Sequence, residues 1–219
     1  MSYLVGTDIG TLGTKSVLVT LEGKVLGEGF KEYDVITLKQ GWAEQWPKPW
    51  EDATYATIKM AVEQSGVDPK EIAGACISAL YGGSGIPVDR EYKPIRPCLI
   101  WADRRAIEEC RWVGNKIGEE ALFNVTGNII DPYYGYTKMI WIRENEPEKW
   151  AKIHRFETPN AYVIRQLTGV ESIDYSSAGN YGGIFDLAKR DWSHEMMEEL
   201  SIPAHFFPQK IHSSEEIVG

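Results

Sequence analysis

The chain has 219 residues, 43% of them hydrophobic and 11% aromatic, so it can bury a sizeable core and is not disordered. Its formal net charge of −9, with no Lys/Arg stripe to offset it, argues against nucleic acid and anionic membranes as partners. The spacing of Cys76, Cys98 and Cys110 disfavours a disulfide framework or a zinc site. Cys76 and Cys98 lie in apolar runs and are expected to be buried. Neither a signal-peptide pattern nor a membrane-spanning run is evident, so we expect a cytoplasmic protein.

The chain opens with the pattern of a β-hairpin. Apolar and β-branched residues favour strands over Tyr3–Thr7 and Lys15–Thr20, with a Gly/Thr-rich tip between them. Val25–Tyr33 is expected to be a third antiparallel strand, followed by a long loop that carries Gly41–Pro47. These segments predict a three-stranded antiparallel sheet at the start of the domain.

The remaining elements alternate between strands and helices. Asp68 is expected to cap a short helical turn that contains Pro69 and Glu71, and Ser176–Gly183 is expected to be a small-residue loop. The expected strands are Ile72–Leu80, Ile86–Val88, Cys98–Trp101 and Glu171–Ile173, and the expected helices are Glu51–Gln64, Arg104–Ile117, Glu119–Val125, Thr137–Asn145, Asn160–Thr168 and Ser193–Leu200. This order indicates an α/β domain with a mixed sheet flanked by helices. The sequence does not show where a second domain would begin.

The tip of the hairpin, Asp8-Ile9-Gly10-Thr11-Leu12-Gly13-Thr14-Lys15, has the residue types of a phosphate-binding turn. Glycine permits close approach and a positive φ, so backbone N–H groups and hydroxyls can converge on a phosphate. Asp8 would hold a hydrated Mg²⁺, which prefers one or two carboxylates plus phosphate oxygens, and Lys15 adds a positive charge. An ordinary hairpin with a polar turn explains the motif equally well, and the spacing of a Walker A loop is absent.

Several segments, in the family's order and spacing, resemble those of the FGGY carbohydrate kinases, which include glycerol kinase, xylulokinase, gluconokinase and ribulokinase. They are Asp8–Lys15, Gly41–Gln45, Trp101–Arg105, Asp131–Tyr133 followed by Thr137–Ile142, and Arg190–Ser193. The resemblance covers nearly the whole chain, so residues 1–219 are identified as an N-terminal domain of this family, without the C-terminal nucleotide-binding half. It implies an actin-like, ribonuclease-H-like fold in which two such domains close over ATP and a sugar.

The resemblance also implies two groups of site residues. The residues expected to meet the ATP phosphates and Mg²⁺ are Asp8, Gly10, Thr11, Leu12, Gly13, Thr14 and Lys15, with Asp8 as the metal residue. Those expected to meet a small sugar or polyol are Tyr81, Gly82, Trp101, Asp103 and Tyr133. The family's catalytic Asp and its adenine pocket belong to the C-terminal half, so no catalytic residue is expected in this chain.

Each sugar-site residue has a plainer alternative. Asp103 is placed to cap the helix that follows it, and Trp101 and Tyr133 could simply pack in the core. Tyr81-Gly82 stands where glycerol kinases have Arg-Glu and xylulokinases have Met-His, which predicts a roomier pocket with one polar contact missing. Lys138 is expected to be a solvated helix lysine, and all four histidines are expected to be structural or on the surface.

The function that follows is ATP-dependent phosphorylation of a small sugar or polyol, with an open-chain pentulose such as xylulose as the first choice. The alternative is a non-catalytic carbohydrate-binding or regulatory module derived from the same fold, and other actin-like ATPases rank third. Because closure of two domains completes such a site, we expect these 219 residues alone to be inactive. Self-association into a homo-oligomer stays open, since an isolated half would expose apolar surface.

Overall fold

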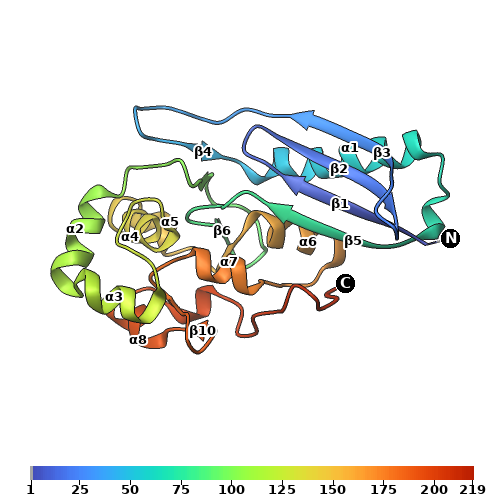
Figure 1. Ribbon diagram of the computed structural model, residues 1–219. Coiled ribbons are helices and arrows are strands. Elements are labelled where there is room, and N and C mark those ends of the chain that lie inside the picture. Colours follow the sequence, from blue (N-terminus) through green and yellow to red (C-terminus); the bar gives the residue numbers. More distant parts are fainter. Residues whose placement is uncertain (1) are drawn as a thin grey trace. The chain divides into compact units, whose positions relative to one another are not determined.

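The computed structural model describes residues 2–219 (Figure 1). It divides into two compact units. The first, which we call the sheet unit, comprises the residues up to Val35 together with Trp46–Leu80. The second, the helical unit, comprises Ile36–Gln45 and Tyr81–Gly219. The loop that carries Trp42 therefore belongs with the later part of the chain, an organisation that the sequence did not reveal.

The sheet unit is built on a four-stranded mixed sheet. Its strands are β1 (Tyr3–Ile9), β2 (Gly13–Thr20), β3 (Val25–Glu32) and β5 (Ile72–Ala79), in the order β3-β2-β1-β5. β1, β2 and β3 form an antiparallel meander, whereas β5 runs parallel to β1 (Figure 1). The predicted opening hairpin, the third strand and the mixed α/β character are confirmed.

One helix, α1 (Pro47–Ser65), packs against the sheet within this unit. Alternate strand residues such as Val5 and Leu18 are buried beneath it, as the two-residue period of a strand requires. The helix begins four residues before the predicted Glu51, because Pro47 has the fixed φ that suits a first helical position. The predicted cap by Asp68 is confirmed: its carboxylate accepts a hydrogen bond from the Lys70 N–H at 3.0 Å.

Glycines on β3 let the backbone of α1 approach the sheet closely. A Cβ atom added at Gly27 would lie 2.1 Å from the carbonyl oxygen of Ala61, and one at Gly29 would lie 2.4 Å from that of Thr57. Neither glycine has a positive φ, so the reason for glycine here is space alone. The contact sets the distance between helix and sheet.

We expect Gly29→Ala to destabilise the chain by about 1–3 kcal/mol, because the new methyl group can be accommodated only by moving α1. Urea unfolding of the 219-residue chain measures this loss. Gly74→Ala on β5 is the matched control, since its Cβ would meet only the flexible Leu4 side chain, at an ordinary 3.7 Å. Equal stability of the two variants would show that α1 does not rest on the β3 backbone.

The other face of the sheet explains one wrong prediction. Cys76 was expected to be buried, but it is exposed. It lies opposite Gly6 on β1, whereas the neighbouring pair, Thr7 and Ile77, points toward α1. Within the described sheet unit no helix covers the Cys76 face, so an apolar run in β5 did not guarantee burial of both sets of side chains. Cys98 is buried, as predicted.

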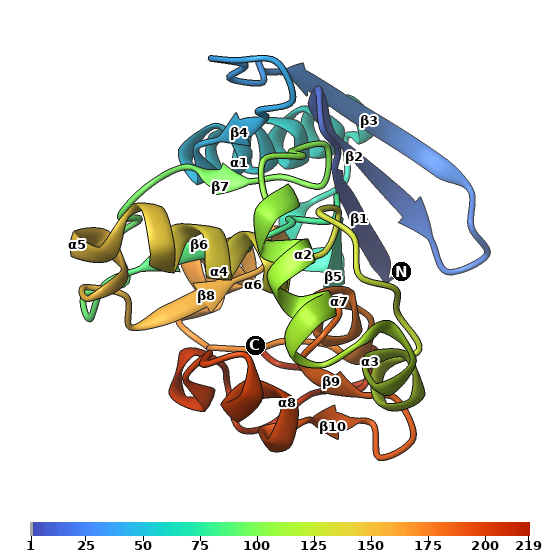
Figure 2. The same ribbon diagram turned by 90° about the vertical axis from the view of Figure 1, so that its left-hand side faces the viewer.

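The helical unit combines short antiparallel strand pairs with helices. Its strands are β4 (Glu44–Gln45), β6 (Ile86–Val88), β7 (Cys98–Leu99), β8 (Arg155–Glu157), β9 (Phe185–Asp186) and β10 (Asp191–Trp192), paired as β4-β7, β6-β8 and β9-β10. Its helices are α2 (Ile107–Lys116), α3 (Glu119–Thr126), α4 (Gly135–Asn145), α5 (Pro147–Trp150), α6 (Pro159–Thr168), α7 (Tyr175–Asn180) and α8 (His194–Glu199), with the short turn η2 (Ala204–Phe206). Helices α2 and α4 lie side by side (Figure 2).

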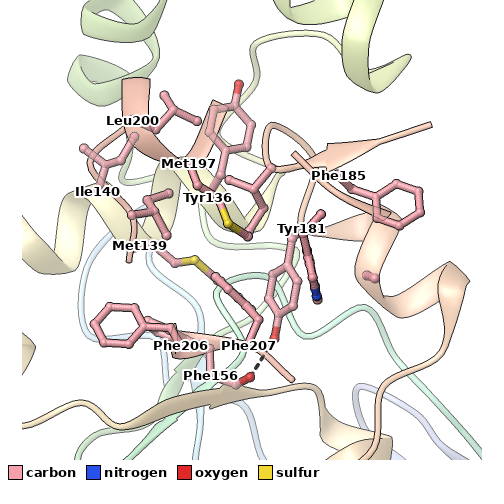
Figure 3. Packing of buried hydrophobic residues seen from close by; sticks show 14 of the residues in the cluster. Tyr136, Met139, Ile140, Phe156, Tyr181, Phe185, Met197, Leu200, Phe206 and Phe207 are labelled. Carbon is pink, nitrogen blue, oxygen red and sulfur yellow. Dashed lines mark hydrogen bonds between the residues drawn. The ribbon is translucent and has the colours of Figure 1, made fainter. Parts of the chain in front are cut away.

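Aliphatic side chains and a group of aromatic rings and methionines form the core of the helical unit. Tyr136 and Met139 of α4 pack with Phe156 of β8 and with Tyr181 and Phe207 from the end of the chain (Figure 3). The Tyr181 hydroxyl donates a hydrogen bond to the Phe156 carbonyl at 3.3 Å, which satisfies the one polar group of that ring. This core fixes the N-terminus of α4, where predicted sugar-site residues lie.

Two predictions for the later half were wrong. Glu171–Ile173 is not a strand, and only the next residue, Asp174, forms an isolated bridge, with His212. The predicted small-residue loop, Ser176–Gly183, overlaps α7, which begins one residue earlier and which the Asp174 carboxylate caps by accepting from the Ser177 N–H at 2.9 Å. A good N-cap thus outweighed the low helix propensity of Ser and Gly in this segment. No helix in residues 2–219 combines the length and apolarity needed to cross a bilayer.

Candidate functional sites

The hairpin tip of the sheet unit is a tight and well-anchored turn. The Gly10 N–H donates to the Gly13 carbonyl at 2.9 Å, and the Tyr33 hydroxyl donates to the Gly10 carbonyl at 2.6 Å. A Cβ at Gly10 would lie 2.9 Å from the Gly13 carbonyl oxygen, yet neither glycine has a positive φ. Glycine is therefore needed here because the backbone segments of the turn approach each other closely. The positive φ that we also considered for these glycines does not occur. Thr11 and Leu12 form the apex, and the Leu12 side chain is 67% exposed.

Asp8 and Lys15 face each other across this hairpin. They are directly paired in the β1-β2 register, so both side chains project from the same face of the sheet. Both are exposed, and the Lys15 ammonium lies 3.0 Å from a Glu28 carboxylate oxygen. The hairpin thus presents a carboxylate and an ammonium side by side, next to a turn of glycines.

Asp8 fits the role of a magnesium ligand. No ion pair to its carboxylate occurs among residues 2–219, and that part of the chain contains no group of three or more His, Cys, Asp or Glu side chains that could enclose a metal. Mg²⁺ does not need such a group, because it keeps several waters and binds through one or two carboxylates plus substrate phosphates. The chemistry of one exposed carboxylate beside a lysine therefore suits a metal–phosphate complex.

Thr14, in contrast, turns away from the proposed phosphate side. Its side chain is fully buried, and its hydroxyl lies 3.1 Å from the Tyr33 hydroxyl. Burial raises the pKa of Tyr33 to about 12, with a smaller contribution from the Asp8 charge, so the phenol keeps the proton that it donates to Gly10. The geometry gives Thr14 a structural role in the turn and does not support a phosphate contact by its hydroxyl.

Three chain segments meet at the predicted sugar-site residues of the helical unit. The Cys98 thiol donates to the Gly82 carbonyl at 2.7 Å, and the Ser84 N–H donates to the Leu99 carbonyl at 3.0 Å. The Gly135 N–H, at the start of α4, donates to the Tyr81 hydroxyl oxygen at 2.5 Å. The structure therefore gathers the segment after β5, strand β7 and the N-terminus of α4, although these are far apart in the sequence.

Aromatic side chains define this meeting point. The rings of Tyr81 and Tyr133 lie 4.8 Å apart between centroids at an interplanar angle of 37°, and Tyr134 packs edge-on against Tyr133 at 5.2 Å. Trp101, just after β7, is 41% exposed. Partly exposed rings of this kind can take up the apolar C–H face of a sugar. The Tyr81 hydroxyl itself is occupied, because it accepts the hydrogen bond from Gly135.

Gly82 does not create extra space. A Cβ atom at this position would lie 2.4 Å from Cδ and 2.8 Å from Cγ of Pro159, the first residue of α6. The prediction of a roomier pocket at Gly82 was wrong, because Pro159 occupies the place that a side chain would need. Gly82 contributes its backbone, whose carbonyl accepts from Cys98.

Asp103 is fully buried and occupied by internal hydrogen bonds. Its carboxylate accepts from the Ala43 N–H at 2.7 Å, from the Arg105 N–H at 3.1 Å and from the Arg105 guanidinium at 2.8–3.0 Å. It does not cap the next helix, because α2 begins only at Ile107 and Ala106 is its N-cap. The geometry therefore supports neither the helix cap nor a direct sugar contact for Asp103.

Arg105 extends this contact into a buried ionic network. Its guanidinium lies 2.7 Å from Glu44, whose carboxylate also accepts from Arg96 at 2.9 Å. It also lies 3.6 Å from the ring centroid of Trp42 and 4.7 Å from that of Trp141, which gives two cation–π contacts. The network fixes the Trp42 loop against the segment after β7, and we expected no such role for these residues.

Lys138 differs most from its predicted environment. It was expected to be solvated, yet it is fully buried. Burial lowers its pKa to about 8, and the charge of Asp103 opposes that shift. An open hollow of about 420 Å³ lies elsewhere, at Ile117, Gly118 and the first turns of α3, and none of the predicted site residues line it.

The sequence matches the model of the FGGY family of carbohydrate kinases, N-terminal domain, over residues 3–219. The chain belongs to the FGGY family. A xylulose kinase of Bacillus subtilis (strain 168) is 31% identical over 213 residues, which cover 97% of this chain and 42% of that protein. A glycerol kinase of Thermococcus gammatolerans is 29% identical over 221 residues, which cover 99% of this chain and 44% of that protein.

Solved structures of FGGY kinases share the fold. A ligand-bound xylulose kinase from Lactobacillus acidophilus matches all of this chain and 44% of that structure, with a TM-score of 0.92 and 26% identity. A gluconate kinase from the same organism covers 95% of this chain and 41% of that structure, with a TM-score of 0.87 and 26% identity. The chain thus has the fold expected of an FGGY N-terminal domain and spans less than half the length of the relatives it matches.

Proposed function

We propose that the protein acts as the N-terminal part of a two-domain kinase that uses ATP and Mg²⁺ to phosphorylate a small sugar or polyol. A pentulose such as xylulose is the first substrate to test. The observation that carries this proposal is the FGGY match over residues 3–219. Two features of the structure support it. Asp8 and Lys15 are paired and could bind a metal and phosphates, and the rings of Tyr81 and Tyr133 could pack against a sugar.

Each residue then has a defined task. When bound, Mg²⁺ neutralises charge on the ATP phosphates, and Asp8 would hold it through its exposed carboxylate. Lys15 lies beside Asp8 and would compensate further phosphate charge, while the turn at Gly10 allows close approach of the phosphates. The Tyr81–Tyr133 pair would orient the sugar, which matters because phosphoryl transfer depends mainly on positioning.

We expect the complete gene product to phosphorylate at least one of glycerol, D-xylulose, D-ribulose and gluconate, and the 219-residue chain alone to show no comparable turnover. The physical reason is that transfer requires a closed, water-poor cleft, and the resemblance assigns the adenine pocket and the proton-accepting Asp to the other half. A coupled ADP-release assay of both proteins with ATP and Mg²⁺ measures this.

Three outcomes separate the hypotheses. Turnover of the short chain at about 1–10³ s⁻¹ would contradict its dependence on a second domain. Phosphorylation of a non-carbohydrate alone would contradict the substrate class. Sugar binding by the complete gene product without any turnover would favour a carbohydrate-binding or regulatory module instead.

A further inference from the structure

Lys138 is a buried lysine whose hydrogen-bonding partners are backbone carbonyls. Its side chain is fully buried on α4, and its ammonium donates to the carbonyl of Pro132 and, at 2.8 Å, to that of Tyr133. A Leu or Met would fill such a place in a core at lower cost, because burying an ammonium is unfavourable unless specific bonds compensate. Lys138 is therefore expected to do something that an apolar side chain cannot.

Its partners form the turn that enters α4. The Asp131 carboxylate accepts from the Tyr133 N–H at 2.7 Å, and the Asp131 carbonyl accepts from the Tyr134 N–H at 3.1 Å. The Thr137 hydroxyl donates to the Tyr134 carbonyl at 2.9 Å. With the two bonds from Lys138, the carbonyls of all four residues from Asp131 to Tyr134 are engaged.

We propose that Lys138 is a positioning residue: it fixes the Asp131–Tyr134 turn and thereby holds the Tyr133 ring against Tyr81 at the sugar site. This inference rests on the proposed function, since Tyr133 matters to substrate only if a sugar binds there. Lys138 does not itself reach the aromatic surface, because both of its hydrogen bonds end on the backbone beneath it. Its effect on a sugar would pass through Tyr133, whose ring lies 4.8 Å from that of Tyr81.

The charges around Lys138 make the role testable by pH. The carboxylates of Asp103 and Asp131 favour its protonated form, whereas the Arg104 guanidinium opposes it. Burial raises the pKa of the nearby Cys98 thiol to about 12, so that thiol carries no charge at the pH at which Lys138 titrates. Burial outweighs the favourable charges and leaves the pKa of Lys138 at about 8. The ammonium should therefore lose its charge near that pH, and its hold on the two carbonyls should weaken.

Hydrogen exchange on the 219-residue chain tests the structural half of the inference. In Lys138→Met, which keeps the length of the side chain but not its donors, amides of Tyr133, Tyr134 and Gly135 should exchange about tenfold faster than in the native chain. Amides of the β6-β8 pair should not change, and Lys149→Met, on an exposed lysine of α5, should leave all of them unaltered. Unchanged exchange at the turn, or equal acceleration everywhere, would overturn the proposal.

Kinetics of the complete gene product test the functional half, with D-xylulose as the probe. Lys138→Met should raise the sugar KM about tenfold and leave the ATP KM within about twofold, and Lys138→Gln, which retains a donor, should give an intermediate sugar KM. In the native enzyme the sugar KM should rise with pH above about 8, and this bend should vanish in both variants. Equal changes in both KM values, or a bend that persists, would overturn the positioning role.

The two experiments distinguish failure of the proposed function from failure of the positioning role. A native gene product that phosphorylates no sugar would overturn the proposed function, while exchange at the turn would still decide whether Lys138 fixes it. Should Lys138→Met not fold, Lys138→Gln provides the same comparison, because the neutral amide can still donate to a carbonyl but cannot titrate.

Discussion

If the proposed kinase function holds, replacing Asp8 with Ala should lower the turnover of the complete gene product by about two to four orders of magnitude, because a bound metal contributes several kcal/mol to stabilising the transferred phosphoryl group. The carboxylate is exposed and pairs with no described cation, so its loss should leave the fold intact. Asp8→Asn should have nearly the same effect, since an amide keeps the shape but removes the charge that attracts Mg²⁺.

Steady-state turnover with saturating ATP and sugar, measured across a Mg²⁺ series, checks this expectation. Asp68→Asn is the matched control: it removes an exposed carboxylate from the same unit, and Asn caps η1 (Pro69–Glu71) as well as Asp does. The control should retain native turnover and the native midpoint of urea unfolding. Near-normal turnover in Asp8→Ala would mean that the opening hairpin is only a structural element.

Features governed by neighbouring residues could be predicted from the sequence. The Gly10–Gly13 turn separates two β-branched runs, and this local pattern was enough to predict β1 and β2. The direct pairing of Asp8 with Lys15 became visible only in the strand register. The alternation of strands and helices likewise indicated the mixed sheet. The boundary of α1 was misplaced because Pro47 was assigned to the preceding loop and not to the first helical turn.

Features governed by distant residues could not be predicted from the sequence. Thr14 belongs to the phosphate-loop motif, but the two-residue period of β2 turns its hydroxyl to the side opposite Lys15. The space beside Gly82 is filled by Pro159, which lies 77 positions later in the sequence. Lys138 is buried because the turn before α4 folds over its ammonium. In each case the decisive contact comes from tertiary packing, which local patterns do not report.

The contacts of Asp103 also come from tertiary packing, and we expect their loss to have a large effect on stability. Its carboxylate accepts from the N–H of Ala43, 60 positions earlier, and together with the Glu44 carboxylate it holds the Arg105 guanidinium. We expect Asp103→Asn to destabilise the 219-residue chain by about 3–5 kcal/mol, because Arg105 would then remain buried with part of its charge uncompensated. Urea unfolding followed by tryptophan fluorescence measures this loss.

Asp131→Asn is the appropriate comparison, because it alters a second bidentate Arg–Asp pair in the same unit. The Arg104–Asp131 pair is partly exposed, so its loss should lower stability by only about 0–1 kcal/mol. In Asp103→Asn, Arg105 should also shift relative to the Trp42 ring, which now lies 3.6 Å from it, and the native-state emission of tryptophan should change. Equal and small losses in both variants, with unchanged emission, would show that the buried network does not hold the Trp42 loop. Because that loop and Trp101 belong to the two segments joined by Asp103, a confirmed effect would make Asp103 a support for the sugar site and not a ligand of the sugar.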